Sequence, residues 1–135
     1  DRFTGEVLCV CDLDTVMLGL SLYDFGDLVR SCASRGSEDQ EAEFDVALFE
    51  ALVEGYLDTT RGFLTEVEVE HLVIAGQLIS FETGMRFLTD YLSGDIYFKT
   101  DYPEHNLKRC RSHFQLVTSL ERYSEELNRI VEKFV

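Results

Sequence analysis

The stretch VLCVCDLDTVMLGLSLYDFGD, residues 7–27, places two aspartates directly after a run of five apolar residues. The run at 7–11 predicts a buried strand, and Asp12 and Asp14 follow it one residue apart. Carboxylates at the end of a buried strand are costly without a partner. These two aspartates are therefore expected to hold a ligand or to take part in chemistry.

Length and charge limit the classes of partner. The chain of 135 residues is long enough for one domain with its own core. Its 26 Asp and Glu against 12 Lys and Arg give a net charge of -14, which disfavours nucleic acid and anionic membranes, because phosphates are bound by clustered basic residues. No apolar run approaches the length of a membrane span, so a cytoplasmic protein is expected.

The four cysteines, Cys9, Cys11, Cys32 and Cys110, lack the spacing of a zinc site. We expect them to be buried free thiols.

Helical spacing dominates the chain after the predicted strand, and the fold class is predicted to be mainly α. Helices are expected over 22–34, 44–60, 65–92 and from Asn106 onward. Thr65 and Glu68 form a capping-box pattern at the start of the third helix, and apolar residues around most of its circumference predict that it is central. The acidic loop SRGSEDQEAE, residues 34–43, is expected to be solvated.

Two chemical interpretations of the aspartates follow. Asp12-Leu13-Asp14-Thr15-Val16 resembles the first motif of haloacid dehalogenase-like phosphatases, in which one aspartate is the phosphoryl-accepting nucleophile and the other its acid/base partner. That chemistry requires a parallel sheet, and the alternation of strands and helices that builds one is not seen in this sequence.

The second interpretation is a kinase-type site. An aspartate just after a C-lobe strand holds the magnesium that neutralises nucleotide phosphates in phosphotransferases. Asp12 has that position, and it is followed by a loop with Gly19 and by Tyr23-Asp24-Phe25 at the start of a helix.

The segment VCDLDTVMLGLSLYDFGDLVRS, residues 10–31, resembles the aminoglycoside phosphotransferase and choline kinase superfamily. In that superfamily an apolar strand is followed by Asp, by a loop with Gly, and by Asp-Leu or Asp-Phe at the start of a helix. Within that superfamily, the sequence most resembles the N-acetylhexosamine 1-kinase-like branch, whose members are sometimes labelled mucin desulfatase. FETGMRFLTDY at 81–91, GDIYF at 94–98 and HNLKRCR at 105–111 look like that branch, so the similarity covers nearly the whole chain.

The resemblance implies roles for individual residues. It makes Asp12 the magnesium ligand and Asp24 an acid that braces the catalytic loop by hydrogen bonds. It implies that Thr15, Arg86 and Tyr97 surround the hexosamine, while Asp14 receives no firm role.

Structural alternatives remain open for several of these residues. Arg86 would equally pair with Glu82 one turn earlier, Tyr97 would cover the core, and Asp24 would cap its helix. His71, His105 and His113 share no spacing, and we expect them to be surface or structural residues, with His105 helping to start the last helix.

The resemblance further implies the helical C-terminal subdomain of a protein-kinase-like fold. Residues 1–21 would form a remnant strand of a hairpin plus the metal-binding loop, and residues 22–135 the helices. The family's His-x-Asp catalytic loop and a Gly-rich nucleotide loop are not in the sequence.

We therefore expect the C-terminal fragment of a sugar kinase whose parent uses ATP and Mg²⁺. The fragment would be inactive alone, would bind neither cofactor tightly, and would have the missing N-terminal lobe and catalytic loop as its partners. The alternative is a stand-alone helical interaction or oligomerisation domain. The face toward the missing parts would be apolar, so the isolated chain is expected to self-associate.

Overall fold

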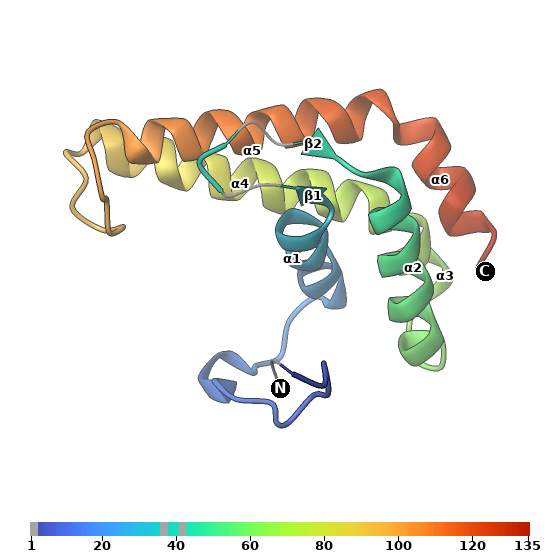
Figure 1. The fold of residues 1–135 in the computed structure, drawn as a ribbon. Coiled ribbons are helices and arrows are strands. Elements are labelled where there is room, and N and C mark those ends of the chain that lie inside the picture. The colour runs from blue at the N-terminus through green and yellow to red at the C-terminus, as the bar shows by residue number, and fades with distance from the viewer. Residues whose placement is uncertain (1–2, 36–37, 41–42) are drawn as a thin grey trace.

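The computed structural model describes residues 3–35, 38–40 and 43–135, and in these residues the fold is mainly α, as predicted (Figure 1). The helices are α1 (Ser21–Cys32), α2 (Val46–Thr60), α3 (Glu66–Glu70), α4 (Leu72–Leu92), α5 (His105–Arg122) and α6 (Ser124–Glu132). A 3-10 turn, η1, covers Leu13–Thr15, and strands β1 (Ser34–Arg35) and β2 (Glu43–Phe44) form an antiparallel pair. None of the helices in the described residues combines the length and apolarity needed to span a bilayer.

Two long helices organise the molecule. Figure 1 shows α4 and α5 side by side and antiparallel, joined by the loop at 93–104, with α1 packed against α4. Helices α2, α3 and α6 gather at the end of the pair away from that loop. One apolar core joins these helices, and its buried residues are Phe25, Val29, Ala33, Phe49, Val53, Leu57, Leu72, Val73, Leu116, Leu120, Leu127, Ile130 and Val131.

Most helix predictions are confirmed within two residues. The capping box forms, since Thr65 N donates to Glu68 Oε2 at 2.8 Å and Glu68 N donates to Thr65 Oγ1 at 3.2 Å. The structure differs from the prediction at two interruptions. The helix expected over 65–92 is divided at His71 into α3 and α4, and the last helix is divided at Tyr123 into α5 and α6.

Glycines allow α4 to approach its neighbours closely. A Cβ added to Gly26 on α1 would lie 2.6 Å from the carbonyl oxygen of Ala75 on α4. A Cβ on Gly84 would lie 2.8 Å from Cε1 of Phe114 on α5. Contacts this short are not available to any side chain, so these positions fix the spacing of α4 from α1 and from α5.

The predicted strand at 7–11 is wrong. This segment is irregular and exposed, with Val7 at 88% and Val10 at 76% exposure, and it pairs with no strand in the described part of the chain. A strand needs inter-strand hydrogen bonds, and a run of apolar residues does not supply them. The prediction of buried thiols is wrong for Cys9, Cys11 and Cys32, which are exposed, and right for Cys110.

Candidate functional site

The candidate site is an open pocket between the C-terminal half of α4 and the loop that follows it. Its volume is about 600 Å³, within the range of small-molecule sites. Its lining residues are Glu82, Met85, Arg86, Thr89, Asp90, Ser93, Ile96, Tyr97 and Phe98. Two residues predicted to surround a sugar, Arg86 and Tyr97, therefore lie in one pocket although they come from different elements.

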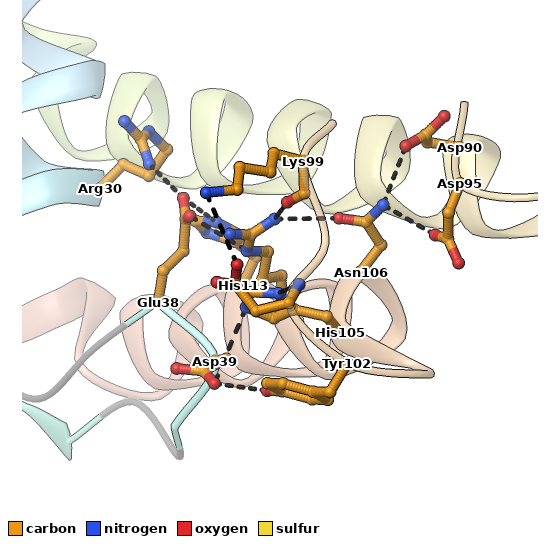
Figure 2. Close-up of polar contacts among 12 residues, drawn as sticks. Arg30, Glu38, Asp39, Asp90, Asp95, Lys99, Tyr102, His105, Asn106 and His113 are labelled. Atoms are coloured by element: carbon orange, nitrogen blue, oxygen red, sulfur yellow. Dashed lines mark hydrogen bonds and ion pairs between the residues drawn. The ribbon is translucent and has the colours of Figure 1, made fainter. Parts of the chain in front are cut away.

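A buried aspartate holds the loop over this pocket. Asp90 Oδ1 accepts from Ile96 N at 3.0 Å and from Tyr97 N at 2.8 Å, and Asp90 Oδ2 accepts from Phe98 N at 2.9 Å. Asn106 Nδ2 donates to Asp90 Oδ2 and to Asp95 Oδ1, each at 2.8 Å (Figure 2). The loop backbone at 96–98 is thereby fixed to α4 and α5.

These donors also set the protonation state of Asp90. Burial disfavours the charged carboxylate, but the N–H groups of residues 96–98 and the amide of Asn106 outweigh it, so the pKa of Asp90 lies below its usual value. The last helix was expected from Asn106 onward. It begins one residue earlier, at His105, and Asn106 is buried within its first turn.

Arg86 and Tyr97 both contact the aromatic ring of Phe98. The Arg86 guanidinium carbon lies 5.7 Å from the centroid of the Phe98 ring, and Tyr97 meets Phe98 edge to face with centroids 4.8 Å apart. Tyr97 is 74% exposed, so it does not cover the core. The described residues show no ion pair between Arg86 and Glu82, although both line the pocket. An exposed ring, a guanidinium and a carboxylate thus share one pocket.

The predicted metal ligand lies in a different part of the molecule. Asp12 is exposed, has a left-handed backbone with φ 62, and precedes η1. Asp14 is exposed within η1, and Thr15 ends this turn, with a side chain outside the described part of the structure. The pocket beside α4 is lined by residues between 82 and 98, so the structure does not bring Asp12, Asp14 or Thr15 into it.

Asp24 lies in the first turn of α1, where it is exposed. It is not the N-cap, which is Leu20, so the capping alternative is wrong. The pKa of Tyr56 is raised, mainly because its hydroxyl group is partly buried and next because of the negative charge of Asp24. Tyr56 OH in turn donates to Ser21 O at 3.0 Å, which ties α2 to the start of α1.

In the acidic loop that was expected to be solvated, Glu38 is exposed as predicted, but Glu38 and Asp39 also contribute to a polar cluster (Figure 2). Glu38 Oε1 lies 3.3 Å from Arg30 Nη1 and 3.4 Å from His113 Nε2, and Glu38 Oε2 lies 3.5 Å from Arg109 Nε. The hydrogen bond with His113 lowers the pKa of Glu38 below its ordinary value of 4.5, and both arginines act in the same direction.

The neighbouring Asp39 makes a second set of contacts. It accepts a hydrogen bond from Tyr102 OH, which raises the pKa of Tyr102, and its Oδ2 lies 3.8 Å from His105 Nε2. His105 and His113 are buried, whereas His71 is exposed. Partners more than sixty residues apart in sequence cannot be found from local patterns. An aspartate inside the apolar helix 65–92 was the one available signal for Asp90.

Glu38 makes stability depend on pH. The pKa of Glu38 in the folded state is below its ordinary value of 4.5. The contribution of Glu38 to the free energy of unfolding is therefore fully present above pH 4.5 and is lost as the pH falls through the folded-state pKa. We expect Glu38→Gln to be less stable near neutral pH and to lose less stability on acidification than the unmodified chain, as measured by urea unfolding at several pH values. The control is Glu125→Gln, at an exposed position on α6. Parallel acid profiles for the unmodified chain and Glu38→Gln would contradict this account.

In the described residues no group of three or more His, Cys, Asp or Glu side chains is arranged to hold a metal ion. Asp12 therefore belongs to no such group among the described residues. A scan of the sequence against models of known protein families gives no match.

Proposed function

We propose that this helical domain is the C-terminal part of the C-lobe of an ATP-dependent sugar kinase of the aminoglycoside phosphotransferase and choline kinase superfamily. The sugar would be of the N-acetylhexosamine type, as in the branch that the sequence resembles. The observation that carries the proposal is the shared pocket of Arg86 and Tyr97. The sequence resemblance selected these two residues independently of any three-dimensional information.

The chemistry of the pocket suits a sugar. The exposed ring of Tyr97 offers an apolar face for the C–H groups of a pyranose, and Arg86, whose guanidinium lies over the Phe98 ring, offers N–H donors. The Glu82 carboxylate is an acceptor for sugar hydroxyl groups. Because Asp90 fixes the 96–98 backbone, Tyr97 needs little reorganisation on binding.

The pocket supplies only the acceptor side of a phosphoryl transfer. The sequence contains no His-x-Asp to orient the attacking hydroxyl group and no Gly-rich nucleotide loop. The proposal assigns the nucleotide, magnesium and the catalytic base to the complete kinase, with Asp12 as one of the metal ligands there. No phosphoryl transfer from ATP to N-acetylhexosamine is expected from the pure 135-residue chain.

A stand-alone interaction domain is the second candidate. It is favoured by the exposed apolar side chains of the segment at 3–20, which include Phe3 at 98% and Leu18 at 102% exposure. In the kinase proposal the missing N-terminal lobe would cover this surface. The exposed apolar side chains therefore do not distinguish the two candidate functions. A His-x-Asp motif encoded upstream of Asp1 would favour the kinase, and sugar binding by the pocket is not expected of an interaction domain.

The sugar proposal is tested by titrating the ¹⁵N-labelled chain with N-acetylglucosamine. Amide signals around Arg86 and Tyr97 should shift saturably, and Tyr97→Ala should raise the Kd about fivefold, because loss of one aromatic contact is worth roughly 1 kcal/mol. Tyr23→Ala is the matched control, since Tyr23 is an exposed tyrosine on α1 outside the pocket lining. Absence of shifts at 82–98, or an equal effect of both variants, would overturn the proposal.

A further inference from the structure

A second pocket adjoins the first and is lined by an unusual share of the chain's cations. Its volume is about 380 Å³. Four of the 12 Lys and Arg residues line it, in a chain whose net charge is -14. These cations are Arg30, Arg86, Lys99 and Arg109, and the lining carboxylates are Asp27 and Glu38. Four cations against two carboxylates leave two net positive charges at this place.

The two carboxylates form ion pairs with the arginines on one side of the pocket. Arg30 Nε lies 2.8 Å from Asp27 Oδ1, and Arg30 Nη1 lies 3.3 Å from Glu38 Oε1. Figure 2 shows Arg30 and Glu38 meeting in front of the long helix pair. Arg109 shares Glu38 at 3.5 Å, and its buried Nε makes no hydrogen bond in the described residues. The charge of Arg30 is therefore balanced by two carboxylates, whereas Arg109 shares only one of them.

The opposite side of the pocket keeps its positive charge. Lys99 Nζ is 3.8 Å from Asp101, and both side chains are largely exposed, so this pair is weak and solvent-screened. Arg86 lies over the Phe98 ring and forms no ion pair with any carboxylate in the described residues. Excess cationic charge is thus concentrated on Arg86 and Lys99.

Arg109 is also held in place before any ligand arrives. The Arg109 guanidinium lies 5.3 Å from the centroid of Phe87, and one of its nitrogens donates to Lys99 O and to Asn106 Oδ1, each at 3.1 Å. Arg86 is placed by Phe98. A guanidinium group that is fixed in this way, as that of Arg109 is, loses little side-chain entropy when it binds an anion.

From this geometry we infer that the pocket binds a tetrahedral oxyanion, contacted by Arg86, Lys99 and Arg109. The chemical class is a phosphate group, either as the free ion or as the ester of a larger ligand. Guanidinium and ammonium donors form charge-assisted hydrogen bonds with such groups, and these are stronger than bonds between neutral partners. The inference does not require the proposed sugar kinase activity.

The two pockets share Arg86 and Phe98 but differ in residues that separate the two hypotheses. Lys99 lines only the cationic pocket, and Tyr97 lines only the sugar pocket. Lys99 is also 91% exposed in its side chain, so its replacement should leave folding unchanged. A failure of phosphate binding can therefore be distinguished from a failure of sugar binding.

The test is a titration of the labelled full chain with inorganic phosphate at constant ionic strength, followed by amide NMR. Signals around Lys99 and Arg109 should shift saturably, and Lys99→Gln should raise the Kd for phosphate about tenfold without changing the response to N-acetylglucosamine. The matched control is Arg111→Gln, an exposed charge removal on α5 outside the lining. Absence of saturation, or equal weakening by both variants, would overturn the inference.

A second arm of the titration distinguishes the source of the anion. N-acetylglucosamine 6-phosphate is compared with inorganic phosphate and with the unphosphorylated sugar. Tighter binding of the ester than of either part, weakened by both Tyr97→Ala and Lys99→Gln, identifies a ligand that spans the two pockets. Equal affinity for the ester and for phosphate, weakened by Lys99→Gln alone, identifies a site for the anion itself. Both results support the oxyanion pocket.

Discussion

Gly26→Ala should lower the free energy of unfolding by about 2 kcal/mol, because α1 and α4 cross where only glycine fits. The added Cβ would lie 2.6 Å from the carbonyl oxygen of Ala75 and 2.6 Å from Cγ1 of Ile79. A side chain such as Ile79 can rotate away, but a backbone carbonyl cannot. The two helices must therefore separate, and this loosens the packing of the neighbouring Phe25 and Val29, which are fully buried.

The control for this variant is Gly55→Ala in α2. A Cβ at Gly55 would meet nothing within 4 Å, so only the higher helix propensity of alanine acts there. Gly55→Ala should raise the free energy of unfolding by roughly 0.5 to 1 kcal/mol. Urea unfolding followed by circular dichroism measures both variants. Opposite signs are expected, and a Gly26→Ala chain as stable as the original would show that α1 and α4 do not cross so closely.

Asp90→Asn is expected to lower Tm by roughly 10 °C and to release the loop at 96–98. Asp90 accepts from the backbone N–H groups of Ile96, Tyr97 and Phe98. Asparagine supplies one acceptor oxygen, and its NH₂ group would face donors that already point at the carboxylate. The partly buried loop donors that face the NH₂ group would then lack an acceptor, which is more costly than the loss of an exposed hydrogen bond.

Thermal unfolding and the amide spectrum test this prediction together. Asp58→Asn, an exposed change on α2, is the control and should leave Tm and the loop signals nearly unchanged. Loss of N-acetylglucosamine shifts in Asp90→Asn should accompany the loop release, since Tyr97 depends on this anchor. An unchanged Tm with unchanged signals at 96–98 would contradict the anchoring role.

Local patterns predicted local structure well. Helix periodicity placed the helices at 22–34 and 44–60 close to α1 and α2, and the capping box at Thr65 forms as expected. These features depend on neighbours within a few residues. The interruptions at His71 and Tyr123 were missed, because an apolar stripe continues on both sides of each break.

Features that depend on distant partners were not predictable from the sequence. The apolar run at 7–11 indicated a strand, but a strand requires a second strand, and none in the described residues pairs with it. Glu38 looked like part of a solvated loop, yet its contact with His113 spans 75 residues of sequence. The union of Arg86 and Tyr97 in one pocket depends on Asp90, whose role as an anchor was not foreseen.

We propose above that the pocket around Tyr97 holds an N-acetylhexosamine. It is tested most directly by intermolecular nuclear Overhauser effects between N-acetylglucosamine and the labelled chain. The account predicts contacts from sugar protons to the ring protons of Tyr97, and their loss in Tyr97→Ala but not in Tyr23→Ala. Contacts to another part of the chain, or none at saturating sugar, would contradict it.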